Sequence, residues 1–271
     1  FSPNLSNSFR LSLGNGYRVV NLFSEEHAAL TGARQVVIVN ELKPEQSWNV
    51  SFNFIRYFSI NKGFINLDAN VFYTYFTNRI VPDYFTDANK IIFNNLNGYA
   101  INRGLNVSAD ATFNKNIKAN LGFTLVEVFT MNKDSLNFEK KQNQIQTPPL
   151  TFNFGLNYHF IKPKITIDMN GTLTSPMLLP VLPHDFRPAE SPWFALINLQ
   201  ITKVFKNNLS IYGGAKNLLN FIPNHPIMRP FDPFDKQISI NNPNGYTFDP
   251  SYNYAPLQGI RVFVGVRYSF K

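Results

Sequence analysis

The chain has 271 residues, a formal net charge of +8, 15% charged residues and 15% aromatic residues. Soluble domains average about 25% charged residues, so this shortfall indicates that much of the surface does not face water. The absence of cysteine excludes a disulfide scaffold and thiolate metal sites, no window approaches the roughly 18 apolar residues of a membrane helix, and no Lys/Arg run is long enough to make nucleic acid an expected partner.

Ten segments alternate between apolar and polar residues, which is the pattern of strands with one apolar face. In chain order the alternation covers 9–13, 48–54, 65–75, 105–113, 117–125, 150–160, 165–173, 193–201, 209–215 and 259–270. The residues between the apolar positions are mostly small and polar, such as Asn66 and Asn170. No long segment carries helical spacing. The sequence therefore predicts an all-β fold of about ten strands.

The connections between these strands alternate in length. Short links at 61–63, 114–116, 161–164 and 206–208 take turns with long links at 15–45, 77–98, 128–148, 175–191 and 219–256. This places every long loop at one end, as in transmembrane antiparallel up-and-down β-barrels, which have short periplasmic turns and long extracellular loops. A soluble sandwich has no reason to separate its loops so strictly.

Aromatic residues sit at both ends of the predicted strands. The short-turn end has Tyr57, Phe58, Phe113, Tyr158, Phe160, Phe205, Tyr268 and Phe270, and the long-loop end has Trp48, Trp193, Tyr73, Tyr75 and Phe76. Two such groups are typical of the aromatic girdles at the two lipid–water interfaces of a membrane barrel. Between them, in the lipid core, a closed barrel can pair every backbone donor and acceptor.

Two charged residues break the pattern by falling on the apolar side of their strands. For Arg56 there are two explanations: a bulge after Phe54 turns Ile55 and Tyr57 outward, or Arg56 extends its charged end to the interface. Glu127 has the same problem, and we expect it to lie beyond the bilayer.

Four stretches carry a family resemblance. Residues 8–18 resemble a strand and G-x-G-[FY]-R turn that lead into an external loop, and residues 42–47 resemble an L-x-P-E-x-S strand entry. Residues 217–220 resemble an N-L-F-N strand end, and Gly259–Phe270 resembles a closing strand. In this order they resemble the C-terminal barrel region of TonB-dependent outer-membrane receptors, most closely those of Bacteroidetes-like bacteria.

The resemblance implies a barrel of about 22 strands with a plugged lumen. Residues 1–271 would be the C-terminal portion of that barrel, with the plug domain absent from this chain. The implied function is that of an active-transport receptor in the outer membrane of a Gram-negative cell, a multi-pass β-barrel that imports a scarce ligand with TonB-coupled energy. A ferric siderophore or other metal chelate ranks first as cargo, and glycan, peptide, haem and corrinoid stay open.

The resemblance also implies partners. These are outer-membrane lipid, the TonB complex through a plug domain outside this chain, a small-molecule or metal-chelate ligand, and a surface lipoprotein. We expect no cofactor, metal site or catalytic residue, because none of the four histidines has a ligand-like neighbour at short spacing. His159 is expected to face the lumen in a structural role, and Asp68, Asp110 and Asp168 to be ordinary lumen filling.

Long loops on a rigid barrel are the natural place for ligand recognition. The proline-rich loop 219–256 is the first candidate, loop 17–33 with its flanks the second, and loop 175–191 adds one histidine. The candidate ligand contacts are Tyr17, Arg18, Glu25, Glu26, His27, His184, His225, Met228, Arg229, Asp232 and Tyr246. Two other roles compete with ligand contact: Gly16, Tyr17 and Arg18 could fix a turn, and the last loop could pack over the rim.

Two other classes of protein stay open. A self-closed ten-stranded barrel enzyme, protease-like, would need a His–Asp pair at the outer rim. His184 and Asp185 are adjacent, and adjacent residues of an extended chain point apart. A structural or adhesive surface barrel is the third class.

Overall fold

In the computed structural model, residues 6–19, 35–38, 41–83, 86–87, 90–133, 138–181, 186–205, 208–226 and 252–270 are described. They form fourteen strands and no α-helix. The strands are β1 (Asn7–Arg18), β2 (Gln35–Ile38), β3 (Glu45–Ile60), β4 (Gly63–Thr77), β5 (Ile80–Asp83), β6 (Lys90–Asn95), β7 (Gly98–Phe113), β8 (Ile117–Lys133), β9 (Glu139–Asn143), β10 (Leu150–Phe160), β11 (Ile165–Thr174), β12 (Phe194–Val204), β13 (Leu209–Lys216) and β14 (Arg261–Tyr268). The prediction of an all-β chain is confirmed.

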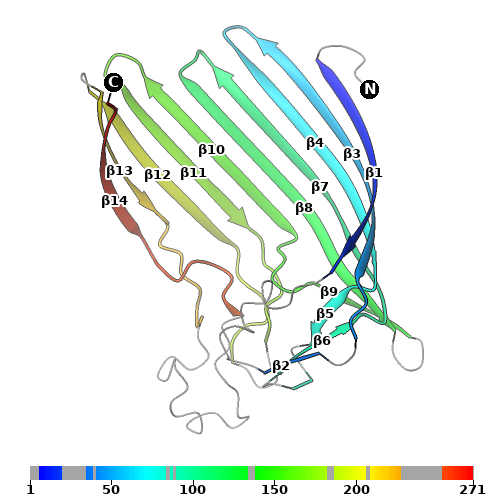
Figure 1. Cartoon of the computed structure of the whole chain (residues 1–271). Coiled ribbons are helices and arrows are strands. Elements are labelled where there is room, and N and C mark those ends of the chain that lie inside the picture. Colours follow the sequence, from blue (N-terminus) through cyan, green and yellow to red (C-terminus); the bar gives the residue numbers. More distant parts are fainter. Residues whose placement is uncertain are drawn as a thin grey trace, which may run out of the picture.

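Ten strands form one curved wall (Figure 1). Their order is β1-β3-β4-β7-β8-β10-β11-β12-β13-β14, and β9 pairs with β8 beside this path. All pairings in the wall are antiparallel. The ten predicted strands are these ten. Among the described strands, β1 and β14 do not pair with each other, so the alternative of a self-closed ten-stranded barrel is wrong for this wall.

Short and long connections lie at opposite ends of the wall, as predicted (Figure 1). The short turns after β3, β7, β10 and β12 gather at one end, which we name the short-turn end. Non-glycine residues in the left-handed conformation sit in these turns: Lys62, Asn114, Lys115, Lys164 and Asn208. The other connections lie at the long-loop end.

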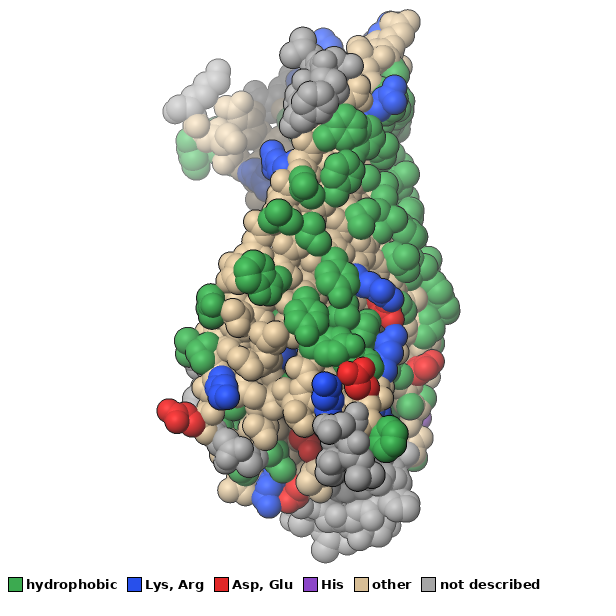
Figure 2. Space-filling model, turned by 90° about the vertical axis from the view of Figure 1, so that its right-hand side faces the viewer, with side chains coloured by type: hydrophobic (Ala, Val, Ile, Leu, Met, Phe, Trp, Pro, Cys, Tyr) green, Lys and Arg blue, Asp and Glu red, His purple; other side chains and the backbone are tan. Residues whose placement is uncertain are grey.

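One face of the wall is apolar across its width. A register row joins Phe9, Phe54, Ala69, Val107, Phe123, Phe152, Leu173 and Ala195 on eight neighbouring strands. Much of this face is bare: Leu13 is 77% exposed and Val264 79%. Figure 2 shows hydrophobic side chains gathered on the side of the molecule that carries β1. An apolar surface of this extent is what a barrel wall presents to lipid.

The other face of the wall is polar. A second register row joins Asn66, Asp110, Asn120, Gly155, Asn170 and Asn198. Amide groups within this face bond to one another across strands, as Asn198 Nδ2 does to Asn170 Oδ1 at 2.9 Å. Cross-strand hydrogen bonds of this kind satisfy part of the polar face.

One large apolar side chain on this polar face has a packing role. Phe263 on β14 stands opposite Gly214 on β13. A Cβ atom at Gly214 would lie 2.7 Å from the Phe263 ring and 2.3 Å from the Leu199 carbonyl oxygen. The ring of Phe263 covers the space that a side chain at position 214 would need, so glycine is required there.

The two exceptions to the alternation have different explanations. The β3–β4 register runs without interruption through Ile55 and Arg56, so a bulge after Phe54 is wrong. Arg56 stays on the apolar side, where its guanidinium lies 4.6 Å from the centre of the Phe58 ring at the short-turn end. Glu127 lies toward the long-loop end and forms ion pairs with Arg103 at 2.6 Å and Lys141 at 2.5 Å.

A small second sheet lies at the long-loop end, inside two predicted loops. Its order is β2-β6-β5, with β2 parallel to β6 and β5 antiparallel to it. Ile91 and Phe93 form its buried core, with Val36, Leu42 and Ile80 packed against them. The sheet joins segments from the first two long connections into one unit.

A second apolar cluster joins the last two long connections. Its buried members are Met177, Leu179, Phe194 and Tyr252. No helix of the described residues is long and apolar enough to cross a membrane.

Candidate ligand-binding site at the long-loop end

An ion pair links the first two strands of the wall where they reach the long-loop end. Arg18 ends β1 and stands opposite Glu45, the first residue of β3. Arg18 Nε donates to Glu45 Oε2 at 2.9 Å, and the Ile80 backbone N–H donates to Glu45 Oε1 at 2.9 Å. Glu45 is buried. Both carboxylate oxygens thus hold neighbouring segments, one on β1 and one at the start of β5.

A second arginine lies beside this pair. Arg79 follows Asn78, which takes a left-handed φ of 53° just after β4 ends. Arg79 Nη2 donates to Gln144 Oε1 at 3.1 Å, and the guanidinium lies 5.6 Å from the centre of the Phe76 ring. Burial lowers the pKa of Arg79, and the nearby Glu45 carboxylate opposes that shift.

One nitrogen of Arg79 is buried without a partner. Within the described residues, Arg79 Nη1 has no hydrogen-bond acceptor. The residue lines a cavity of about 340 Å³ together with Arg18, Glu45, Ser47, Phe76 and Ile80. We name this space the Arg79 cavity. Its charged lining residues are two arginines and one glutamate, which leaves an excess of one positive charge.

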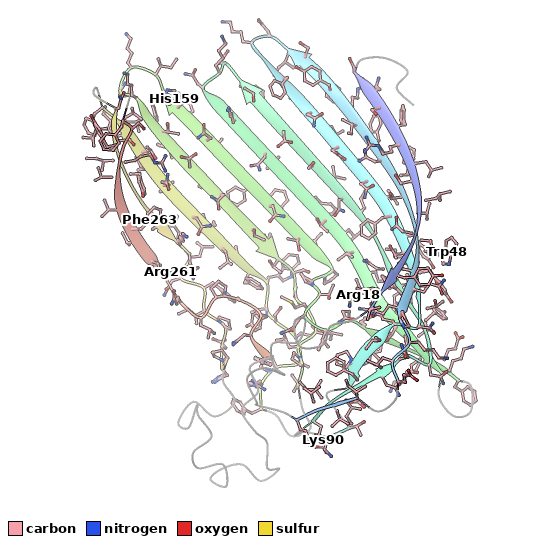
Figure 3. All side chains as sticks on the ribbon, in the orientation of Figure 1. Arg18, Trp48, Lys90, His159, Arg261 and Phe263 are labelled. Carbon is pink, nitrogen blue, oxygen red and sulfur yellow. The ribbon has the colours of Figure 1, made fainter. Side chains whose placement is uncertain are left out.

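The positions of Tyr17 and Arg18 correct one prediction. Gly16, Tyr17 and Arg18 do not form a turn, because β1 continues through Arg18 and pairs with β3 to its end. Successive side chains of a strand point to opposite faces. Arg18 therefore meets Glu45 on the polar side, whereas the Tyr17 hydroxyl accepts a hydrogen bond from Gln46 Nε2 at 2.8 Å. Figure 3 labels Arg18 at the long-loop end of β1.

Two asparagines fasten the base of the last long connection. Asn217 and Asn220 both take left-handed φ values, 55° and 53°. The Asn217 amide bonds to Phe221 N, Phe221 O and Gln258 O, and Asn220 Oδ1 accepts the Ile260 N–H at 3.1 Å. The N-L-L-N stretch therefore ties the two ends of this connection together, which explains physically why asparagine stands at both positions.

The described part of the same connection packs on its neighbour. Tyr252 is fully buried, and its hydroxyl donates to the Pro188 carbonyl at 2.9 Å. Phe221 stacks on Phe194 at 4.8 Å. His225 lies edge-on to Phe186 at 5.4 Å. At these positions the connection packs over the rim.

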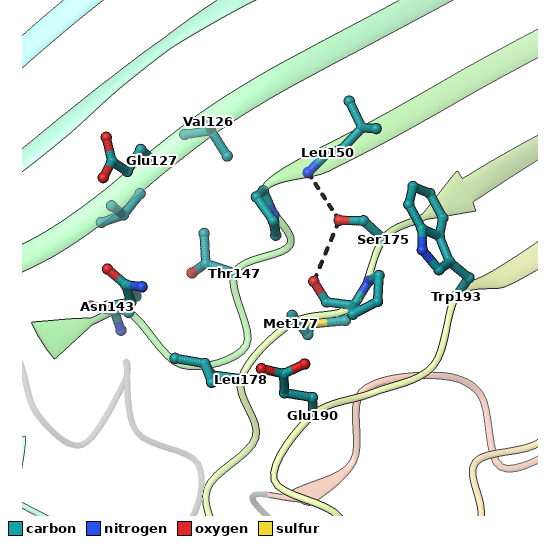
Figure 4. A pocket seen from close by; sticks show the side chains of 14 residues that line it. Val126, Glu127, Asn143, Thr147, Leu150, Ser175, Met177, Leu178, Glu190 and Trp193 are labelled. Atoms are coloured by element: carbon teal, nitrogen blue, oxygen red, sulfur yellow. Dashed lines mark hydrogen bonds between the residues drawn. The ribbon is translucent and has the colours of Figure 1, made fainter.

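A cavity lies between β8, the segment before β10 and the segment after β11 (Figure 4). It measures about 490 Å³. Ser175 Oγ accepts the Leu150 N–H at 3.0 Å and donates to the Pro176 carbonyl at 3.4 Å. Leu150, Met177 and Trp193 give this cavity an apolar wall. Two carboxylates also line it: Glu127, which is paired with two cations, and Glu190.

Three of the residues predicted to face the lumen, Asp68, Asp168 and His159, have side-chain partners. Asn53 Nδ2 donates to Asp68 at 2.6 Å, and Asn157 Nδ2 donates to Asp168. His159 lies on the polar face, as predicted, with Nδ1 3.0 Å from Thr166 Oγ1 (Figure 3). No group of three or more His, Cys, Asp or Glu residues within the described ranges could hold a metal ion.

Comparison with known proteins supplies the deciding observation. The family model described as "TonB dependent receptor-like, beta-barrel" matches residues 1–218. The chain belongs to the TonB-dependent receptor family. Among curated proteins, none matches the chain.

Solved structures of TonB-dependent receptors share the fold. The FrpB iron transporter from Neisseria meningitidis aligns over 100% of this chain and 38% of its own, with a TM-score of 0.64 and 15% identity. The ferric-catecholate import receptor Fiu from Escherichia coli K12 aligns over 99% and 34%, with a TM-score of 0.65 and 11% identity. The FpvA–pyoverdine–Fe complex of Pseudomonas aeruginosa aligns over 84% and 28%, at 0.59 and 11%. The chain thus spans about a third of the length of these receptors.

The matching family model describes a receptor barrel, and FrpB is named as an iron transporter. The family consists of outer-membrane proteins of Gram-negative bacteria that bind small-molecule ligands. The family model describes a β-barrel, and the structure shows an amphipathic wall of strands with all long loops at one end, so the two agree. The predicted contacts Glu25, Glu26, His27, His184, Met228, Arg229, Asp232 and Tyr246 lie outside the described residues and stay predictions.

Two residues that the sequence does not predict for this region, Glu45 and Arg79, lie beside Arg18. Glu45 stands in the L-x-P-E-x-S stretch, which marks a strand entry but does not reveal its partner. Arg79 stands in a loop with no motif. Only the register of β1 on β3 and the bend at Asn78 bring them beside Arg18.

Proposed function

We propose that this protein is an outer-membrane active-transport receptor that imports a scarce metal chelate, with a ferric siderophore as the preferred cargo and TonB as the energy source. The observation that carries the proposal is the wall itself: an exposed apolar face, a polar face, and all long connections at one end. In this arrangement the apolar face contacts outer-membrane lipid, the short turns face the periplasm, and the long loops face outside.

The cargo class comes from the relatives. FrpB is an iron transporter and Fiu a ferric-catecholate import receptor. The sequence identity between this chain and these receptors is low. The likeness therefore shows a shared fold, and the cargo is our proposal. We propose further that residues 1–271 are the C-terminal portion of the barrel, that a plug domain encoded with them contacts TonB, and that a surface lipoprotein is a partner at the long loops.

Transport is tested in a strain that lacks the gene for the full-length receptor. We expect growth on ferric siderophores under iron limitation, and uptake of radioactive iron from them, to fall to background. A strain lacking tonB should show the same loss, and plasmid-borne receptor should restore uptake only when TonB is present. Unchanged uptake from every ferric chelate supplied, with loss of haem or corrinoid uptake instead, would reject the iron cargo.

A further inference from the structure

The positive charge of this chain is concentrated at the short-turn end. The segments around the four short turns and the end of β14 are 56–67, 111–120, 157–167, 200–211 and 263–271. Each contains two Lys or Arg residues and no Asp or Glu, which gives ten positive charges. The rest of the chain has the other 15 Lys or Arg residues and all 17 Asp and Glu residues, a balance of −2. The net charge of +8 therefore comes entirely from this end.

Turn conformation does not explain why only one sign of charge occurs. Asn and Asp share the side-chain geometry that favours turns and the left-handed conformation. The short turns use asparagine at Asn61, Asn114, Asn116, Asn207 and Asn208, and never aspartate. A turn that only meets water can carry either sign. The exclusion of carboxylates from all four turns therefore indicates a constraint on charge.

Backbone hydrogen bonds join neighbouring hairpins at this end. The Asn114 N–H donates to the Lys62 carbonyl at 2.9 Å, and the His159 N–H donates to the Asn116 carbonyl at 2.7 Å. The Val204 N–H donates to the Lys164 carbonyl at 2.9 Å. Neighbouring turns are two strands apart, which places their lysines about 10 Å from one another. Because this distance is close to the screening length in physiological salt, the positive potentials of the turns add.

Six described cations of these segments form what we name the cationic rim: Arg56, Lys62, Lys115, Lys162, Lys164 and Lys203. The four turn lysines among them are exposed. Within the described part of the chain, every ion pair uses a carboxylate of the long-loop end, and none includes a rim cation. Cations of one sign along an edge repel one another and attract an anionic surface.

Two members of the cationic rim lie on the apolar face beside aromatic rings. The Arg56 guanidinium lies 4.6 Å from the centre of the Phe58 ring, and Lys203 Nζ lies 5.8 Å from that of Phe205. Lys203 Nζ also donates to the Pro163 carbonyl in the neighbouring turn. Aromatic rings of a membrane barrel sit at the level of the lipid headgroups, and long basic side chains extend their charged ends there. The rim therefore lies at the level of lipid phosphates.

We propose that the cationic rim binds the phosphate groups of anionic phospholipids in the leaflet next to the short turns. This inference rests on the proposed placement of the wall in a membrane and not on the cargo. The phosphates offset the repulsion among the rim cations. Because the opposite end has no excess of positive charge, the rim also gives the barrel a preferred side for anionic lipid.

The test measures the lipid selectivity of the full-length receptor in phosphatidylcholine vesicles. Spin-labelled phosphatidylglycerol and phosphatidylcholine compete for the barrel surface, and electron spin resonance gives the ratio of their association constants. We expect the wild type to prefer phosphatidylglycerol about fivefold, the gain that one basic residue gives near an anionic surface, and high salt to reduce this preference. Glutamine at the four turn lysines should lower the preference to about twofold or less: Lys62→Gln, Lys115→Gln, Lys162→Gln and Lys164→Gln.

Two matched variants separate charge from position. Arginine at the same four positions keeps the charge and should keep the preference. Glutamine at four lysines of the long-loop end removes the same charge elsewhere and should leave the preference unchanged: Lys43→Gln, Lys90→Gln, Lys133→Gln and Lys140→Gln. Folding of each variant is checked by its migration on unheated gels.

The outcomes separate this inference from the transport function. Equal association of the two lipids with the wild type, or an equal loss in the long-loop control, would reject the rim as the lipid site even where iron uptake depends on the gene. An unchanged preference in the four-glutamine variant would also reject it and leave an acidic periplasmic protein as the partner of the rim. If the rim selects phosphatidylglycerol but iron uptake does not depend on the gene, the rim stands and the iron cargo is rejected.

Discussion

Arginine in place of Val107 should strongly impair insertion of the barrel into membranes. Val107 lies on the apolar face of β7, in register with Ala69 and Phe123, midway between the two aromatic girdles. An arginine facing lipid at the bilayer midplane costs about 2–4 kcal/mol. We therefore expect Val107→Arg to lower the unfolding free energy of the full-length receptor in lipid vesicles by that amount, as measured by urea titration.

The neighbouring position supplies the control. Asn106 precedes Val107 on the same strand but lies on the polar face, opposite Asn70 and Thr124. Arginine at position 106 would face water, and its effect should stay within about 0.5 kcal/mol, as for most surface substitutions. Equal losses for the two variants, or a larger loss for Asn106→Arg, would show that the apolar face does not meet lipid.

A valine in place of Gly214 should destabilise the end of the wall. Its Cβ would approach the Leu199 carbonyl oxygen to 2.3 Å and the Phe263 ring to 2.7 Å. The ring can rotate, but the backbone oxygen cannot leave without loss of the β12–β13 pairing. Overpacking of this kind costs about 1–3 kcal/mol. We expect a lower urea midpoint and less folded protein in the membrane fraction.

Gly213→Val is the matched comparison for that substitution. Gly213 is adjacent but points to the apolar side, where its nearest neighbour would be the Phe263 carbonyl oxygen at 3.4 Å, an ordinary contact. Its urea midpoint should stay close to that of the wild type. If Gly213→Val were as destabilising as Gly214→Val, the loss would come from replacing strand glycines in general and not from the close approach of Phe263 and Leu199.

The wall could be predicted from sequence because lipid imposes a simple rule on every strand. Each strand must keep its apolar side chains on one face, so the period of two persists from Phe9 to Tyr268. The same rule correctly flagged Arg56, although its explanation is a cation over the Phe58 ring and not a bulge. The strict alternation of short and long links then predicts the up-and-down order of the strands, which the structure has.

The small sheet could not be predicted in this way. Strands β2, β5 and β6 have four to six residues, too few to show a period. The parallel pairing of Val36 with Ile91 joins two segments far apart in sequence, which no local pattern encodes. Their stability comes instead from the buried pair Ile91 and Phe93, which is visible only in three dimensions.

The candidate site was partly predictable. The sequence predicts Arg18 as a loop or turn residue, whereas the register places it in β1 with Glu45 opposite. Arg79 carries no sequence signal, because a lone arginine after a strand is usually solvated. Its burial depends on Phe76, on Gln144 and on the bend at Asn78, and no local sequence pattern links these three features.

The central claim is that the wall crosses the outer membrane with its long loops outside. Residues 1–271 contain no cysteine, so a single introduced cysteine is the only thiol of this part, and any cysteine elsewhere in the full-length receptor is first replaced by serine. Thr86→Cys in a long connection and Asn116→Cys in a short turn are made in the full-length receptor, and intact cells are treated with a maleimide too large to enter the periplasm. We predict labelling of residue 86 on intact cells and of residue 116 only after the outer membrane is opened. Labelling of residue 116 on intact cells, or protection of residue 86, would contradict this topology.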